Sequence, residues 1–534
     1  MRISAVLSGV LVLCAALTRA EDTPDVLVYG GTPGGVAAAV AAARNGARTA
    51  LIEQTGHVGG LNTSGINTAE SEHMLKWTFG GISLEFYERL GKLYGKNEPA
   101  YYFESSTAEK VFNEMLSEAK VETRFKLRVN KVEKEGARIK KITLSDGTAL
   151  AAKVFIDATY EGDLMARAGV SYTFGRESRD TYHEECAGIR LDKTTRKGAP
   201  FDKDGRLLPG VSVRKEDLVE GAADPLTMNY NFRLCFTKKK DNQVPIPEPA
   251  HYDANRYALL KNFCVEQTAS GKKMTLSDFV DLYGRANGKF EVNNKQASVI
   301  SLGHFGGQAG YSDASYEKQD AIYADHKEYT LGLLYFLGHD ESVPQNVRDE
   351  LKQWGLTKDE FADNGNWPYY LYVREARRMK GRYVMTQKDV QEETKKDDAI
   401  GMGSHFIDCH HVQRVAVSPT EFCNEGRIWR IGKAYEIPYR SLTPKAEECE
   451  NLLVSVASSF SHVAFCTYRL ESTWMVGGHA AGAAAAMAAK SGKSVQDVPI
   501  SELQKVLEEQ KQVIHFIPGK PIRFEGGTAG PPEF

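Results

Sequence analysis

The sequence lacks several patterns that would assign it to a common class of protein. None of its eight cysteines forms a C-x-x-C pair, so the local ligand pattern of a zinc site or an iron–sulfur cluster is missing. Neither sign of charge is in excess, because 67 Lys and Arg residues balance 70 Asp and Glu residues. This balance argues against nucleic acid as a partner.

The N-terminus carries a short apolar run, residues 3–17, between Arg2 and the sequence Thr18-Arg19-Ala20. The run is shorter than the roughly 20 residues that a membrane-spanning helix prefers. We therefore expect residues 1–20 to be a signal peptide cleaved after Ala20, with an uncleaved anchor as the alternative. A secreted or periplasmic protein with no membrane span after signal removal is predicted, and no second arginine adjoins Arg2 to indicate twin-arginine export.

Residues 25–65 contain the strongest functional signal. A short apolar run ends at Tyr29, a glycine-rich turn follows, and an alanine-rich segment leads to a second apolar run that ends at Glu53. This pattern predicts a βαβ unit in which the helix N-terminus binds a pyrophosphate and the acid binds a ribose. The middle glycine of G-x-G-x-x-G is a threonine here, and an ordinary βαβ crossover that binds nothing is the alternative. The residues expected to bind are Gly30, Thr32, Pro33, Gly34, Gly35 and Glu53.

A glycine pair, Gly59-Gly60, follows Glu53 by six residues and precedes Leu61. With this pair, the sequence resembles the FAD-dependent oxidoreductases of the glutathione reductase fold, related to fumarate reductase and heterodisulfide reductase flavoproteins. Some of these relatives are labelled xanthan lyase. The resemblance implies an α/β, Rossmann-like FAD-binding domain with an inserted α+β substrate domain, and it implies that Gly59, Gly60 and Leu61 contact FAD. The iron–sulfur clusters of some relatives are not implied, because their ligand pattern is missing.

Two further segments carry the resemblance. After an alternating stretch that predicts a β-meander, residues 122–155, the run Ala158-Thr159-Tyr160 leads to Asp163, although the family most often has glycine in place of the tyrosine. Near the C-terminus, Gly477 is expected to open a long alanine-rich helix whose start faces the flavin. The resemblance adds Ala158, Thr159, Asp163, Gly478 and Ala480 to the expected FAD contacts.

The chain is long enough for two or more domains. We predict a FAD-binding domain split between residues 21–175 and 422–495, a substrate domain at 176–421, and a C-terminal helix and tail at 496–534. Residues 374–381, rich in arginine, are expected to form a helix with a solvated face. The H-x-x-D-x-H-H sequence from His405 to His411 follows no metal-ligand pattern, and no metal site is predicted.

The predicted reaction is hydride transfer between flavin N5 and an unidentified small or carbohydrate-like substrate. No second G-x-G-x-x-G unit occurs in the middle of the chain, so electrons are expected to leave through a substrate, oxygen or an external acceptor. A polysaccharide lyase of the xanthan type and a non-catalytic flavin-binding protein are the alternatives. His57 does not align with the histidine that forms a covalent flavin link in fumarate reductase relatives, so the FAD is expected to be non-covalent.

The candidate catalytic residues are arginine, histidine, glutamate and tyrosine side chains in the C-terminal part of the chain. Fumarate reductase relatives use arginine and histidine at the substrate face, and the segment before the alanine-rich helix supplies residues of these types. A structural pairing of Arg469 with Glu471 is an equally good interpretation of these two residues. If the first set fails, the site is expected among His405, His410 and Arg374. The first set is His462, Arg469, Glu471 and Arg430, with Tyr439 as a further candidate.

Overall fold

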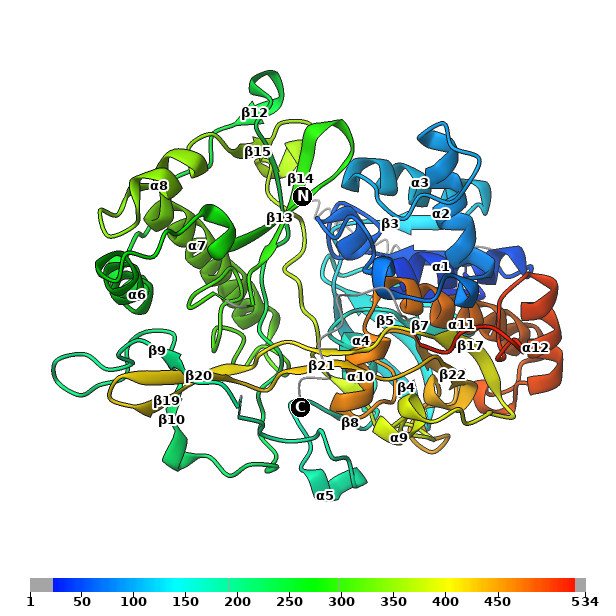
Figure 1. Ribbon diagram of the computed structural model, residues 1–534. Coiled ribbons are helices and arrows are strands. Elements are labelled where there is room, and N and C mark those ends of the chain that lie inside the picture. The colour runs from blue at the N-terminus through cyan, green and yellow to red at the C-terminus, as the bar shows by residue number, and fades with distance from the viewer. Residues whose placement is uncertain (1–22, 192, 297, 524–534) are drawn as a thin grey trace, which may run out of the picture.

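The structure is a computed structural model that describes residues 23–191, 193–296 and 298–523, without the side chains of residues 430 and 431. The predicted signal peptide lies outside the described residues. Within these ranges, no helix combines the length and apolarity needed to cross a bilayer. The chain forms two lobes, and both ends of the chain contribute to one of them (Figure 1).

A five-stranded parallel sheet organises the first lobe in the order β23-β7-β1-β2-β3. The four residues of β1 are all buried, which is expected of a strand covered on both faces of a parallel sheet. The predicted βαβ unit is therefore present, and the last strand arrives from the C-terminal part of the chain. The strands are β1 (Val26–Tyr29), β2 (Thr49–Ile52), β3 (Glu122–Arg124), β7 (Val154–Asp157) and β23 (Leu452–Val454).

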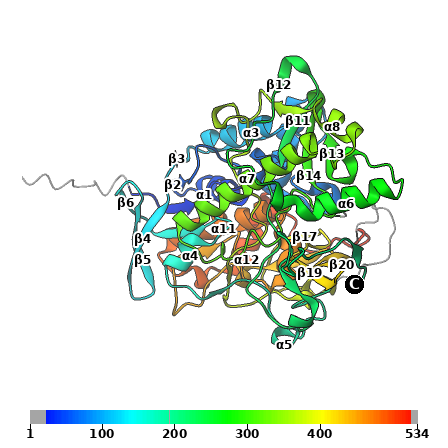
Figure 2. The ribbon, with the colours of Figure 1, turned by 90° about the vertical axis from the view of Figure 1, so that its left-hand side faces the viewer.

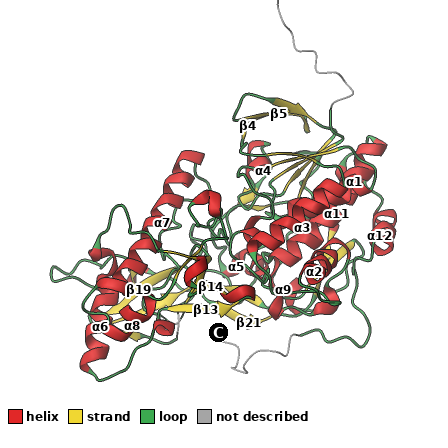
Figure 3. Ribbon diagram, turned by 90° about the horizontal axis from the view of Figure 1, so that it is seen from above, coloured by secondary structure: helices red, strands yellow, loops and turns green. Residues whose placement is uncertain are grey.

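Two helices, α1 (Pro33–Arg44) and α11 (Glu471–Ser491), lie side by side on this sheet (Figure 3). The two helices are in close contact, since a Cβ on Gly478 would stand only 2.0 Å from the carbonyl oxygen of Gly34. The helix expected to open at Gly477 begins six residues earlier, at Glu471. Gly478 lies inside the helix and allows it to pack closely against α1. The same lobe also contains α2 (Gly81–Leu93), α3 (Ser105–Glu118) and α12 (Ile500–Glu509).

The predicted β-meander forms a separate antiparallel sheet at one end of the molecule (Figure 2). It contains β4 (Val129–Glu135), β5 (Arg138–Leu144) and β6 (Ala149–Ala151). The first and last strands of the expected stretch, β3 and β7, pair with the parallel sheet instead. Alternation in the sequence identified these strands but not the sheet to which each belongs.

The second lobe is built around an antiparallel sheet, in the order β12-β15-β11-β14-β13, with helices α6, α7 and α8 beside it (Figure 1). A four-stranded sheet, β10-β19-β20-β9, adjoins it, and β20 crosses the boundary predicted at residue 421. The domain limits stay predictions. The elements are α6 (Ala258–Ala269), α7 (Tyr316–His339), α8 (Gln345–Leu351), β9 (Arg196–Lys197), β10 (Val213–Arg214), β11 (Leu234–Thr237), β12 (Gln243–Val244), β13 (Val280–Gly284), β14 (Lys289–Asn294), β15 (Gly355–Thr357), β19 (Gln413–Ser418) and β20 (Glu421–Glu425).

The helix predicted over residues 374–381 is wrong. This segment is extended, and its strand β16 (Arg378–Met379) pairs with β8 (Tyr172–Thr173). The arginines are buried rather than solvated, since Arg374 and Arg378 are both 0% exposed and donate to groups distant in sequence. The shorter elements are α4 (Asp163–Arg167), α5 (Arg179–Tyr182), α9 (Gln387–Gln391), α10 (His462–Tyr468), β17 (Ala399–Gly403), β18 (Ile407–Cys409), β21 (Ile428–Ile431) and β22 (Tyr435–Pro438).

Candidate functional site

The glycine-rich turn after β1 is shaped by very close backbone contacts. Gly30 has a φ of +104°, and a Cβ on it would stand 2.7 Å from the backbone of Ala158 at the end of β7. Thr32 caps α1 by accepting from the backbone N–H of Gly35 at 3.1 Å, and its hydroxyl donates to the Ala158 carbonyl at 2.8 Å. The threonine in place of the middle glycine therefore ties the turn to β7.

Glu53 lies directly beside this turn, as its spacing predicted. Its side chain is buried and accepts from the backbone N–H groups of Gly31 and Thr55, both at 2.6 Å, and from the hydroxyl of Tyr370. Burial raises the pKa of Glu53, and these hydrogen bonds oppose the shift. Two of its partners, Thr55 and Tyr370, line a cavity of about 230 Å³.

The glycine pair passes close to the start of α1. A Cβ on Gly60 would stand 2.2 Å from the hydroxyl oxygen of Tyr160 and 3.1 Å from Cδ of Pro33. That hydroxyl accepts from the Leu61 N–H at 2.9 Å and donates to Glu471 at 2.9 Å. The tyrosine that replaces the usual glycine of the family thus joins the glycine pair to the start of α11.

The turn after β7 is held by its own side chains. Thr159 donates to Asp157 at 2.7 Å and accepts from the Asp163 N–H at 3.1 Å, and the Asp163 carboxylate contacts Arg377 at 3.1 Å. Ala480, like Gly478, lies in the buried interior of α11 rather than at its start. The roles predicted for these residues in FAD binding stay predictions.

Several buried polar groups without a partner gather on two segments, residues 62–64 and 471–474. The side-chain amide of Asn62 has no partner at either atom, and the hydroxyls of Ser64 and Thr473 and the indole N–H of Trp474 also have none. Buried polar groups are nearly always hydrogen-bonded, so such a concentration fits a polar ligand. These residues fit the polar edge of a flavin. In the same arrangement, the turn at Gly30 would bind the pyrophosphate and Glu53 would bind the ribose.

A second cavity has a volume of about 530 Å³. Its wall includes Glu70, which follows the 62–64 segment, and the carbonyl of the preceding Ala69 accepts from Ser472 in the first turn of α11 at 3.3 Å. The lining is strongly polar, with aromatic rings among charged groups. It includes Glu70, Arg233, Tyr102, Tyr283, His405, Asp408, His410 and Trp429.

Arg469 supports the wall of this second cavity from behind. Its buried guanidinium donates to the Asp408 carboxylate at 2.9 Å and to the Tyr372 hydroxyl at 2.7 Å. Tyr372 in turn donates to Glu70 at 3.0 Å. The proposed structural pairing of Arg469 with Glu471 is wrong, because Asp408 is the ion-pair partner and Glu471 bonds to Tyr160. Burial raises the pKa of Glu471 well above its ordinary value.

Burial and Arg469 help to determine which side chains of the cavity wall are charged. Burial lowers the pKa of His405 to about 4, and burial together with the charge of Arg374 lowers that of His410 to about 3, so both rings are neutral at pH 7. Burial alone would raise the pKa of Asp408, but His410 and Arg469 hold it well below its ordinary value. Five acceptor-capable atoms on the described lining residues have no partner: Nε2 of His405, Nδ1 of His410, Oδ1 of Asp408, Oε2 of Glu72 and Oε1 of Gln296.

The other predicted catalytic residues lie elsewhere. His462 is buried behind the wall, with Nδ1 at 2.9 Å from Glu375 and Nε2 at 3.4 Å from Sγ of Cys409. The Tyr439 hydroxyl donates to the Val495 carbonyl, and the side chain of Arg430 lies outside the described residues. The sequence did not predict three residues of this site, because no motif marks them and only the tertiary fold brings them close to Asp408. These residues are Glu70, Arg233 and Tyr372.

His57 is held by the protein rather than left open toward the flavin site. Its ring stacks on Tyr369 at 3.5 Å and contacts Glu109 at 2.8 Å and Asp363 at 2.9 Å. Burial lowers the pKa of His57, but the hydrogen bond and charge of Glu109 and the charge of Asp363 outweigh it and raise the pKa overall. Both ring nitrogens therefore have carboxylate partners.

The chain shows partial likeness to several solved structures. Solved structures with a partial likeness include THI4 of Thermovibrio ammonificans, with 19% identity over 29% of this chain and 66% of that one and a TM-score of 0.22. Thioredoxin reductase of T. acidophilum matches at 21% identity over 25% and 34% of the chains, with a TM-score of 0.18. This chain thus covers less than two thirds of each of these structures. No curated protein matches it at a significant level.

The family comparison covers far more of the molecule. The model of the family described as FAD dependent oxidoreductase matches residues 25–507. This match includes the glycine-rich turn, Glu53, the unpaired groups on both segments and the second cavity. The chain is therefore a flavoprotein enzyme with a Rossmann-like FAD-binding fold, and it belongs to the FAD dependent oxidoreductase family.

Proposed function

We propose that this enzyme dehydrogenates a hydroxyl group of a small, carbohydrate-like substrate bound in the second cavity. Bound FAD supplies a hydride acceptor, N5 of the flavin. The observation that carries the proposal is the set of unpaired acceptors on the cavity wall, at His405, Asp408 and His410. Acceptors of this kind suit a substrate that presents several hydroxyl groups.

Removing a hydride from an alcohol carbon requires that its hydroxyl proton also leave. His410 is placed to accept that proton, because it lines the cavity and its Nδ1 has no partner, although burial and the charge of Arg374 lower its pKa and so weaken it as a base. Nε2 of the same ring lies 3.5 Å from the Asp408 carboxylate, which Arg469 fixes. Asp408 therefore orients the ring and favours its protonated form. Trp429 and Tyr283 on the wall offer flat surfaces for the apolar face of a sugar.

The test is anaerobic reduction of the bound flavin by a panel of monosaccharides and alditols. We expect His410→Gln and Asp408→Asn to retain FAD but to slow bleaching by about 100-fold or more, the usual contribution of one proton-transfer group. His339→Gln is the control, since that partly exposed histidine ends α7 and does not line the cavity. Unchanged rates in both site variants would refute the assignment. A lyase or a non-catalytic flavoprotein would leave the flavin oxidised with every compound.

We further propose that the enzyme is secreted or periplasmic and passes its electrons to oxygen or to an external acceptor. Support comes from the sequence of residues 1–20 and from the lack of a second G-x-G-x-x-G unit. N-terminal sequencing of the exported protein is expected to begin at Glu21. A cytoplasmic protein that retains residues 1–20 would contradict the export proposal.

A further inference from the structure

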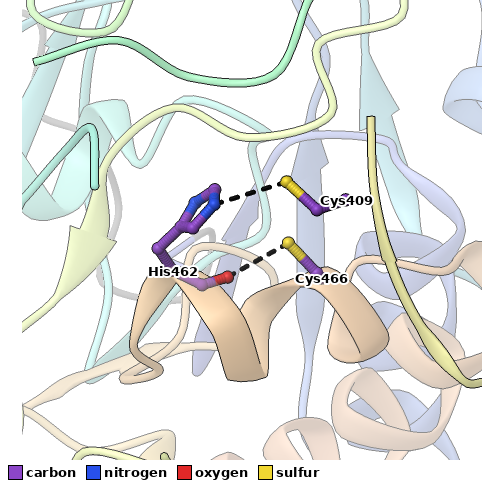
Figure 4. A group of neighbouring side chains, drawn as sticks. All are labelled: Cys409, His462 and Cys466. Atoms are coloured by element: carbon purple, nitrogen blue, oxygen red, sulfur yellow. Dashed lines mark hydrogen bonds between the residues drawn. The ribbon is translucent and has the colours of Figure 1, made fainter. Parts of the chain in front are cut away.

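Behind the cavity wall lies a second cluster of reactive side chains that the proposed reaction does not use. Cys409 ends β18, and His462 and Cys466 lie one helical turn apart on α10 (Figure 4). The two thiol sulfurs and a ring nitrogen all lie within 4.8 Å of one another. All three residues are 1% exposed or less, so the cluster is closed to solvent.

We propose that Cys409, His462 and Cys466 bind a zinc ion. Thiolate and imidazole are the ligands that zinc prefers. In a tetrahedral site, with Zn–S near 2.3 Å and Zn–N near 2.1 Å, the sulfur and nitrogen ligands stand about 3.6 Å apart. Sγ of Cys409 and Nε2 of His462 are 3.4 Å apart. The two atoms are therefore already spaced as zinc ligands.

The surroundings of His462 favour this role. Nδ1 contacts both oxygens of Glu375, at 2.9 and 3.0 Å, and a proton held there leaves the Nε2 lone pair directed at the cluster. Metal-binding histidines almost always donate their other nitrogen to such a carboxylate or carbonyl. Glu375 is itself fixed by an ion pair with the buried Arg378. The ligand is thus oriented by a second layer of buried partners.

The charges of the cluster also suit a divalent cation. Two thiolates balance the charge of Zn²⁺, so the occupied site would be neutral, which a fully buried position requires. A bound cation removes the repulsion that disfavours a second thiolate.

The position of the ion would give it a supporting role in the active site. In β18, Asp408 lines the cavity, whereas Sγ of the next residue, Cys409, contacts His462 on α10. Arg469, which pairs with Asp408, caps the end of α10. A zinc ion would therefore link β18 to α10 directly behind the Asp408–Arg469 ion pair at the cavity wall. This inference does not depend on the identity of the substrate.

The test is the metal content of the full-length flavoprotein purified under reducing conditions with zinc present, with bound FAD as the check of folding. We expect about one zinc per chain in the wild type and in Cys264→Ser, a buried cysteine of α6 outside the cluster, and less than about a tenth of that in Cys409→Ser and Cys466→Ser. If either cluster variant fails to fold, zinc-edge X-ray absorption of the wild type decides, with two sulfur ligands expected. No zinc, copper in its place, or a Cys409–Cys466 disulfide in the purified protein would overturn the proposal.

Discussion

Replacing Glu53 tests whether the acid at the end of β2 holds the cofactor. The carboxylate accepts hydrogen bonds from two backbone N–H groups at 2.6 Å and from the Tyr370 hydroxyl, so it is fixed in place. A charged hydrogen bond to a ribose hydroxyl contributes about 1.5–3 kcal/mol, which is about tenfold to more than a hundredfold in affinity. Glu53→Ala is expected to weaken FAD binding by this factor, and Glu53→Gln by the smaller part of it because an amide oxygen remains.

The alanine variant also leaves the N–H groups of Gly31 and Thr55 without a partner, so stability must be measured separately from affinity. The assay is titration of FAD into the deflavinated protein, followed by flavin fluorescence, with the urea midpoint recorded for each variant. Glu85→Gln serves as the control, because this carboxylate on α2 pairs with Arg44 away from the turn. Equal dissociation constants for the wild type and Glu53→Ala would remove Glu53 from the ribose-binding role.

Three further predictions concern packing, pH and the cofactor link. Gly478→Val is expected to destabilise the protein by about 1–3 kcal/mol, because its side chain would meet the Gly34 carbonyl, and an unchanged urea midpoint would contradict the close α1–α11 contact. Burial lowers the pKa of His479 from 6.5 to about 4, so the stability that its neutral form contributes is full above pH 6.5 and falls as the pH drops toward 4. Between pH 7.5 and 5.0 the wild type should therefore lose about 2 kcal/mol more than His479→Gln, and parallel pH curves would refute this. Acid precipitation is expected to release FAD into the supernatant, whereas yellow colour in the pellet would indicate a covalent link.

Structural features that depend on residues close together in the chain could be predicted from the sequence. The turn at Gly30 and the spacing to Glu53 depend on local backbone geometry, and the structure places that carboxylate against the Gly31 N–H. The segment at 374–381 could not be predicted in the same way. Arg378 is buried because Glu177, 201 positions away, and Glu375 neutralise it, and no local pattern records such partners.

The cavity wall and the start of α11 show the same limit. Tyr372 and Asp408 meet Arg469 only after the chain has folded, across 97 and 61 positions respectively. The glycines at 477–478 were interpreted as a helix start from the resemblance to the family. In the structure they lie inside α11, where a Cβ on Gly478 would meet the Gly34 carbonyl of α1 and a Cβ on Gly477 would meet the Tyr468 hydroxyl. Sequence periodicity cannot reveal which helix an element will contact.

The place of β23 at the edge of the parallel sheet has a consequence for the order of folding. The side chain of Asn451, just before β23, bonds to the carbonyl of Lys153, just before β7, across 298 positions. Closing a loop of this length costs about 2 kcal/mol more than closing the roughly 30 residues of a simple βαβ crossover. Until residue 452 has been synthesised, β7 is an edge strand with unpaired backbone groups and α1 lacks its partner helix. The inserted lobe can thus fold first, while the nucleotide-binding domain closes only when the chain is nearly complete.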